Sequence, residues 1–86
     1  MTRNEFKELV MSAGIDDVIV INKADYRKAN IDFDRSSGEF SWSAEHKYLG
    51  WVFPGPGQIV QTFKTINGAR KSLIKKFERL FEEDIK

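Results

Sequence analysis

Cysteine is absent from this chain of 86 residues, and histidine occurs once, as His46. The absence of cysteine excludes disulfides, thiolate catalysis and cysteine-ligated zinc or iron–sulfur centres. A nucleophile–base pair would have to use His46, and no glycine-rich elbow surrounds any serine. A zinc site would have to combine His46 with carboxylates, and no His-x-x-x-His spacing is present. We therefore expect no enzymatic activity, no metal and no cofactor; a hydrolase using the carboxylates Asp32 and Asp34 is the remaining catalytic alternative.

The chain also lacks a long apolar run and an excess of charge of one sign. No segment approaches the roughly 20 apolar residues that a membrane-spanning helix needs, and the first ten residues are charged where a signal peptide would be apolar. The 14 basic and 13 acidic side chains give a formal net charge of +1. Such a balance provides no global attraction to nucleic acid or to an anionic membrane. We expect a cytoplasmic protein without a membrane partner.

The length and the 41% hydrophobic content predict one small folded domain, residues 1–86, with a helix near each end. The first helix spans about residues 3–13, because Thr2 and Glu5 fit a capping box ahead of an apolar stripe. The second spans about residues 66–83, and Thr65 precedes it as a cap. Its apolar side chains recur at three- and four-residue spacing: Ile66, Ala69, Leu73, Ile74, Phe77, Leu80 and Phe81.

Between the helices lie segments with the alternation or the β-branched content of strands, namely 17–22, 28–34, 39–45, 48–53 and 58–64. Residues 28–34 and 39–45 flank a turn and form the clearest hairpin. Residues 17–22 are apolar on both parities and predict a central strand covered on both faces, or partly so. The economical arrangement places both amphipathic helices on one side of the strands. The predicted fold is α+β: a single antiparallel sheet of three to five strands with the N- and C-terminal helices packed on one face.

These periods also predict which side chains are buried and where the backbone turns. The predicted core is Phe6, Leu9, Val18, Val20, Ile31, Phe33, Phe40, Trp42, Phe63, Ala69, Leu73, Phe77 and Leu80. Gly38 and Gly55 lie in turn-rich clusters between strand candidates, and each is expected to adopt a positive φ.

The second helix has an unusual order of charges, because its bases precede its acids. The helix dipole favours the reverse order, and free N–H groups at a helix start attract anions. Bases gathered there predict an anion or partner site: Lys64, Arg70, Lys71 and Lys75. The alternative is a solvated face whose bases pair with acids of the same helix or of the first one.

The hairpin has the opposite charge on its polar parity, where Asp32, Asp34 and Glu39 alternate with serines. An acidic sheet face disfavours contact with DNA or RNA bases but suits a basic protein surface. Trp51 and Phe53 precede the Pro-Gly-rich turn and are candidate interface anchors. The alternatives are plain solvation of the acids and burial of the two aromatic side chains in the core.

The sequence Thr62-Phe63-Lys64-Thr65, followed by Ala69, resembles a strand-to-helix corner of small phage and mobile-element proteins. Arm-DNA-binding domains of tyrosine integrases carry such a corner after a three-stranded sheet, as do some phage-encoded inhibitors of bacterial defence systems. The resemblance covers about 20 of the 86 residues. It implies that Phe63 and Ala69 pack together while Thr65 caps the helix. The integrase domains also imply a basic, aromatic sheet face, from which this chain departs at Asp32, Asp34 and Glu39.

The function that these patterns favour is a non-enzymatic binding protein acting by protein–protein contact, of the kind found as accessory or inhibitor proteins in phages and mobile elements. The alternative is a nucleic-acid-binding domain that uses the basic start of the second helix. The patterns predict no particular oligomeric state.

Overall fold

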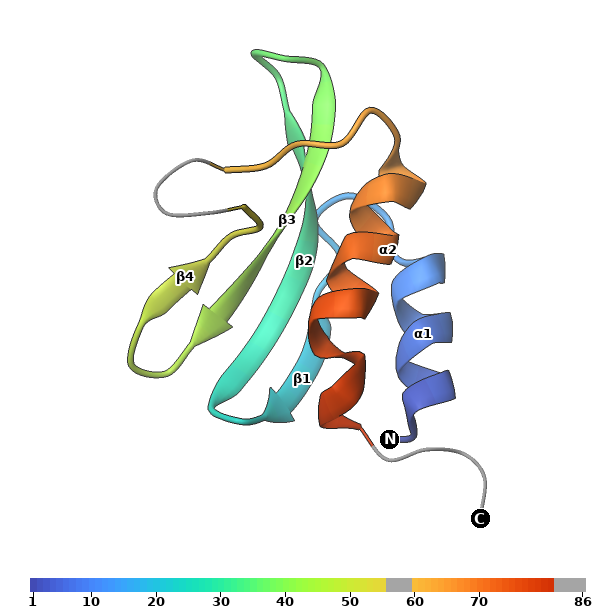
Figure 1. Ribbon diagram of the computed structural model, residues 1–86, viewed down its shortest axis with the longest axis vertical. Helices are drawn as coiled ribbons and strands as arrows, with labels where there is room; N and C mark the ends of the chain where they lie inside the picture. Colours follow the sequence, from blue (N-terminus) through green and yellow to red (C-terminus); the bar gives the residue numbers. More distant parts are fainter. Residues whose placement is uncertain (56–59, 82–86) are drawn as a thin grey trace.

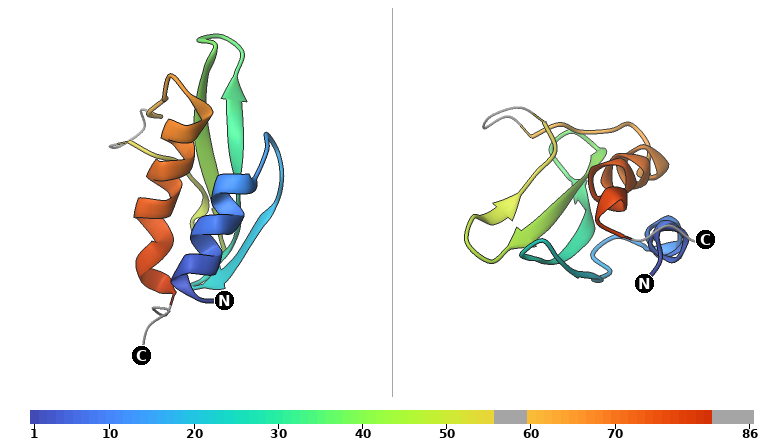
Figure 2. Two further views of the ribbon diagram at one scale, coloured as in Figure 1. Left: turned by 90° about the vertical axis from the view of Figure 1, so that its right-hand side faces the viewer. Right: turned by 60° about the horizontal axis from the view of Figure 1, so that its bottom comes forward.

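The computed structural model describes residues 1–55 and 60–81. Its elements are α1 (Arg3–Ser12), β1 (Ile19–Lys23), β2 (Tyr26–Asp34), β3 (Glu39–His46), β4 (Gly50–Val52), α2 (Ile66–Phe77) and the short 3-10 helix η1 (Glu78–Leu80). The strands form one antiparallel sheet in the order β1-β2-β3-β4. Figure 1 shows α1 and α2 on the same side of this sheet, and both views of Figure 2 show the same two layers. The predicted α+β fold is confirmed.

Both helices begin where the sequence predicts, because their caps form. The Thr2 hydroxyl accepts a hydrogen bond from the Glu5 backbone N–H at 3.1 Å, and the Glu5 carboxylate accepts one from the Thr2 N–H at 2.8 Å. The Thr65 hydroxyl accepts from the Gly68 N–H at 3.0 Å. Each cap satisfies a donor that lacks a partner within the helix. The second helix changes to 3-10 geometry at Glu78, and residues 82–83 of its predicted span lie outside the described residues.

The central hairpin of β2 and β3 has the predicted alternation and turn. Ile31 lies opposite Trp42 and Phe33 opposite Phe40, so the apolar parity of both strands faces the same way. The turn between the strands places Gly38 at φ 73°, and its N–H donates to the Asp34 carbonyl at 2.8 Å. Gly55 has a φ of 105°. The positive φ predicted for both glycines is therefore confirmed.

The core lies between the apolar parity of the sheet and the two helices. Its buried side chains are Phe6, Val10, Ala13, Ile19, Ile21, Ala29, Ile31, Trp42, Ala44, Ala69, Leu73, Phe77 and Phe81. From the predicted core, six side chains are buried: Phe6, Ile31, Trp42, Ala69, Leu73 and Phe77. Phe40, Phe63 and Leu80 are partly buried against them. Leu9 and Phe33 lie at the margin and are exposed.

The prediction for the first strand is wrong in its position and in its buried side chains. The strand β1 is at the edge of the sheet rather than in its centre, and the helices cover one of its faces, which is the partial cover that the sequence allowed. Ile19 and Ile21 are the buried pair, whereas Val18 and Val20 are 60% and 50% exposed. A run that is apolar on both parities cannot indicate which parity faces the helices, and the sheet has helices on one side only in the described part of the chain.

The predicted strand 58–64 is also not formed in its described part. Phe63 makes a single bridge to Phe40, with N···O distances of 2.8 and 2.7 Å, and its neighbours are irregular. The chain must pass from the far side of β3 to the start of α2, as Figure 1 shows, and it therefore touches the strand at one residue. Residues 58 and 59 of that prediction lie outside the described residues.

Within residues 1–55 and 60–81, no helix combines the length and the apolar character needed to cross a membrane.

Gly38→Ala should lower the free energy of unfolding by about 1 kcal/mol, because a side chain is strained at positive φ. An added Cβ at Gly38 meets no atom within 4 Å, so the backbone alone supplies this effect. Gly14→Ala is the matched control, since its Cβ would lie at an ordinary 3.4 Å from the Asp17 carboxylate. Chemical denaturation measures both, and equal losses in the two variants would contradict the prediction.

Candidate functional site

The side of the sheet that faces away from α1 and α2 carries the polar parity of the hairpin, and we call it the helix-free face (Figure 2). The pairs Asp32–Ser41 and Asp34–Glu39 lie across β2 and β3 on this face. Trp51 of β4 shares it, because Trp51 is opposite Glu45. Three predicted carboxylates and one predicted aromatic anchor therefore stand on one surface, together with the exposed Val20 of β1. These groups come from all four strands.

The carboxylates of this face differ in their surroundings. Asp34 accepts hydrogen bonds from the Ser36 N–H at 3.0 Å and from the Ser36 hydroxyl at 2.7 Å, and these bonds hold the pKa of Asp34 below its usual range. Burial raises the pKa of Asp32, although hydrogen bonds from Ser43 and Asn30 oppose this effect. Glu39 accepts from the Thr62 hydroxyl at 2.6 Å. Asp34 is partly exposed, so a cation can approach its carboxylate.

Two serines of the polar parity are buried, which the alternation alone does not reveal. Ser41 and Ser43 are each 5% exposed. The Ser41 hydroxyl donates to the Gln61 carbonyl at 2.9 Å, because the segment that leads to α2 crosses the face at this point. The Ser43 hydroxyl donates to the Asn30 side-chain oxygen at 3.4 Å. The sequence signal for this burial is the presence of small hydroxyl side chains between the acids, because a serine can be covered by the chain and still form a hydrogen bond.

A hollow of about 310 Å³ lies on the helix-free face, and we call it the acidic pocket. It is lined by Asp32, Phe33, Asp34, Ser41, Phe53, Val60 and Thr62. The pocket brings the predicted anchor Phe53 together with the predicted carboxylates Asp32 and Asp34, although the sequence separates them. Trp51 is not part of its lining; it lies farther along the face and is 49% exposed. The arrangement offers apolar side chains beside two carboxylates, which suits a partner group with an apolar body and a positive charge.

The predicted basic site at the start of α2 is only partly assembled. Lys64, Lys71 and Lys75 are exposed, but Arg70 is partly buried. Its Nε donates to the Ala13 carbonyl at 3.1 Å and its Nη2 donates to the same oxygen, while Nη1 donates to the Asn67 side chain at 2.8 Å. Arg70 therefore closes the C-terminal end of α1, where a carbonyl lacks a partner within the helix. The expectation of an exposed Arg70 free to bind an anion is wrong, because α2 begins beside the end of α1 (Figure 1).

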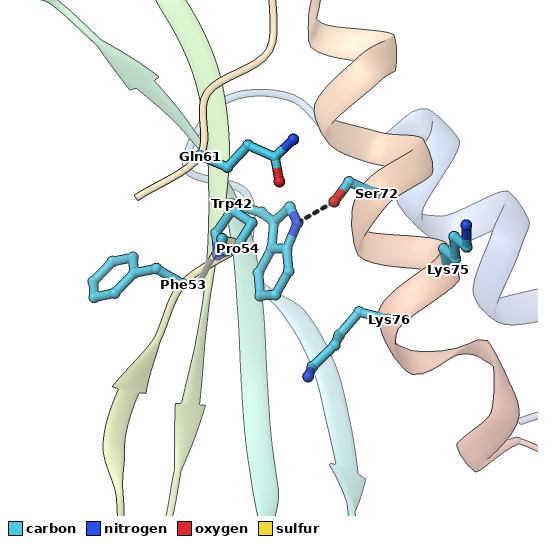
Figure 3. Close-up of a pocket in the computed structure, with 8 residues that line it drawn as sticks. Trp42, Phe53, Pro54, Gln61, Ser72, Lys75 and Lys76 are labelled. Atoms are coloured by element: carbon cyan, nitrogen blue, oxygen red, sulfur yellow. Dashed lines mark hydrogen bonds between the residues drawn. The ribbon is translucent and has the colours of Figure 1, made fainter. Parts of the chain in front are cut away.

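A second hollow, of about 260 Å³, lies between β3 and α2. Figure 3 shows its lining residues, with the Trp42 indole donating to the Ser72 hydroxyl at 2.9 Å. Lys76 extends toward the indole, while the labelled Lys75 points away from it. Lys76 was not among the predicted site residues. The packing of α2 on the sheet brings Lys76 into one hollow with Trp42 and Phe53, which no spacing in the sequence indicates.

The single histidine lies apart from both hollows. Its Nδ1 accepts hydrogen bonds from the backbone N–H groups of Tyr48 and Leu49 at 3.1 and 3.2 Å, so this lone pair is used to hold a turn. Among the residues that the structure describes, no group of three or more histidines and carboxylates is placed to hold a metal ion. Neither hollow has His46 in its lining.

Comparison of the chain with protein-family models, with curated proteins and with solved structures finds no match. The resemblance of the Phe63–Thr65 corner to phage and mobile-element domains therefore stays a prediction.

Arg70→Met should lower the free energy of unfolding by about 1–3 kcal/mol, because the Ala13 carbonyl loses both guanidinium donors. Lys71→Met, one residue along on the exposed side of α2, should stay within about 0.5 kcal/mol of the wild type. Urea denaturation of the two variants measures the difference. If Arg70→Met proved as stable as Lys71→Met, the guanidinium would not have the structural role assigned here.

Asp32→Asn should stabilise the protein at neutral pH. The raised pKa of Asp32 means that the folded state binds this proton more readily than the unfolded state does, so the ionised carboxylate opposes folding. The gain should shrink as the pH falls through the folded-state pKa and vanish below the ordinary value of 3.8. Asp34→Asn is the matched control with the opposite sign, since the pKa of Asp34 is lowered. Thermal melts across this pH range test both, and a gain for Asp32→Asn that persists in acid would contradict the assignment.

Proposed function

We propose that this chain is a non-enzymatic binding protein that acts by protein–protein contact through its helix-free face. The observation that carries the proposal is the acidic pocket, where the half-exposed ring of Phe53 lies beside Asp32 and Asp34. Aromatic side chains at the edge of a hollow are frequent hot spots, and neighbouring charges select the partner. The partner that fits is a protein surface that presents lysine or arginine next to an apolar side chain.

The biological setting in this proposal comes from the strand-to-helix corner. The resemblance of Phe63–Thr65 to small phage and mobile-element domains supports an accessory or inhibitor protein of such an element, acting in the cytoplasm. A small non-catalytic inhibitor works by covering a surface of its target, and a face without helices leaves room for such contact.

The alternative function is nucleic-acid binding through α2. It is favoured by the exposed Lys64, Lys71 and Lys75, which have no ion pair among residues 1–55 and 60–81. It is weakened by Arg70, whose guanidinium is occupied by the Ala13 carbonyl. The acidic helix-free face would repel phosphates, so binding of this kind would have to use the helix side of the molecule alone.

The proposal predicts that capture of a protein partner depends on the helix-free face and not on α2. The wild type and two variants are immobilised and exposed to lysate of the source organism. The face variant carries Phe53→Ser and Asp34→Lys, and the helix variant carries Lys71→Glu and Lys75→Glu. A protein captured by the wild type should be lost at least tenfold with the face variant, since truncation of a hot spot costs 2 kcal/mol or more. The helix variant should retain it.

A salt titration with duplex DNA and with RNA supplies the control for the alternative. Phosphate contacts would give affinity that falls steeply with salt and that the helix variant abolishes. Such a result, together with capture that is equal for the wild type and the face variant, would overturn the proposal in favour of nucleic-acid binding. Circular dichroism of both variants checks that they are folded.

A further inference from the structure

The turn between β3 and β4 carries the most exposed large apolar side chains of the described residues. Tyr48 and Leu49 are 78% and 72% exposed, and we call residues 47–49 the β3–β4 tip. The tip stands at the end of the sheet where Tyr26 pairs with His46, beyond the helix-covered region (Figure 1). Exposed aromatic and aliphatic side chains gathered at a protruding turn indicate a contact site.

The backbone of the tip is held by hydrogen bonds, although the side chains of Tyr48 and Leu49 are exposed to solvent. The His46 Nδ1 accepts from the N–H groups of both Tyr48 and Leu49, and the His46 ring packs edge-on against Tyr48. The Lys47 N–H donates to the Asp25 carbonyl at 2.9 Å, which ties the tip to the neighbouring turn. A preformed backbone lowers the entropy lost when the side chains are bound. The tip therefore holds the exposed side chains of Tyr48 and Leu49 on a fixed backbone.

The surroundings of the tip are basic. Lys23, Arg27 and Lys47 are exposed there, and among residues 1–55 and 60–81 the exposed carboxylate beside them is Asp25. The remaining charges nearby, Lys28 and Glu45, neutralise each other across 3.9 Å. The tip thus combines an apolar projection with positive charge.

The acidic pocket has the complementary character on the same molecule. Its apolar side chains on the helix-free face are Phe53 and Val60, and its charge comes from Asp32 and Asp34. One copy cannot fill its own pocket, because the tip lies beside Tyr26 and the pocket lies at the opposite end of β2. A strand rises about 3.3 Å per residue, so the distance from Tyr26 to Asp34 is roughly 25 Å. Projection and pocket can meet only between two copies.

We propose that the β3–β4 tip of one copy inserts Leu49 and Tyr48 into the acidic pocket of a second copy, with Lys47 facing Asp34. This inference rests on the proposed function, since it uses the same face and names the partner as another copy of the chain. The contact joins two different surfaces, so it is head-to-tail and leaves a free tip at one end and a free pocket at the other. Further copies add to these ends, and the assembly grows with protein concentration.

Sedimentation velocity of purified protein tests this arrangement with complementary variants. The tip variant carries Leu49→Asp. The second protein is the face variant defined above, which carries Phe53→Ser and Asp34→Lys. The wild type should form species larger than a dimer between micromolar and millimolar concentration, and added salt should weaken them. Each variant alone should be monomeric. An equimolar mixture should form a dimer and nothing larger, because it retains one working tip and one working pocket.

Met11→Asp supplies the matched control, since Met11 is an exposed apolar side chain on α1 and should leave the association unchanged. A dimer in the mixture also shows that both variants are folded. A wild type that stays monomeric at millimolar concentration, a mixture that stays monomeric, or a tip variant that still associates would each overturn the inference.

Failure of this inference and failure of the proposed function are separable. A monomeric wild type whose helix-free face still captures a protein from lysate overturns self-association alone. In that case the tip variant should also retain the captured protein, because a foreign partner would be bound by the acidic pocket and would not need the tip.

Discussion

The packing of Trp42 between the hairpin and α2 is the interaction on which the rest of the structure depends. The indole is buried, lies opposite Ile31 in the sheet, and meets the Phe77 ring edge-on with centroids 5.7 Å apart. Its N–H reaches Ser72, so the largest core side chain leaves no buried donor without a partner. This contact fixes α2 across β3, and the stacked rings of Phe6 and Phe81 then hold α1 against the chain that follows η1.

One consequence of that packing is the division of the sheet into two unlike faces. The helices cover the apolar parity except at its margin near Phe33, and the polar parity carries Asp32, Asp34 and the two buried serines. Because the last connection crosses this second face, hydroxyl groups are covered while the neighbouring carboxylates stay accessible. The same crossing brings Val60 and Thr62 over the hairpin and so forms a hollow where alternation alone would predict a flat, solvated surface.

The sequence predicted the features that depend on neighbouring residues, namely the hairpin and the starts of the two helices. The hairpin register follows from strict alternation, and the helix starts follow from Thr2 and Thr65, whose caps need no information from elsewhere in the chain. The sequence could not predict which side of β1 faces the helices, because Val18 and Val20 are as apolar as their buried neighbours. The position of Arg70 depends on α2 starting beside the end of α1, which no spacing in the sequence encodes. The acidic pocket likewise depends on the path of the chain after Phe53, where the β-branched content indicated a strand that the crossing prevents.

The pairing of the two helices has a consequence for how this molecule is made. They stand side by side although they belong to opposite ends of the chain, and Arg3 donates to the Glu78 carbonyl at 3.2 Å while Lys7 lies 3.4 Å from the Glu78 carboxylate. Contacts between residues this distant in sequence form late, because the whole intervening chain must be ordered to bring them together. During synthesis on the ribosome, the apolar stripe of α1 is therefore without its partner until the residues of α2 have emerged. Residues 3–12 are thus translated well before the residues of α2 that cover their apolar stripe, and they stay accessible to proteases and chaperones until then.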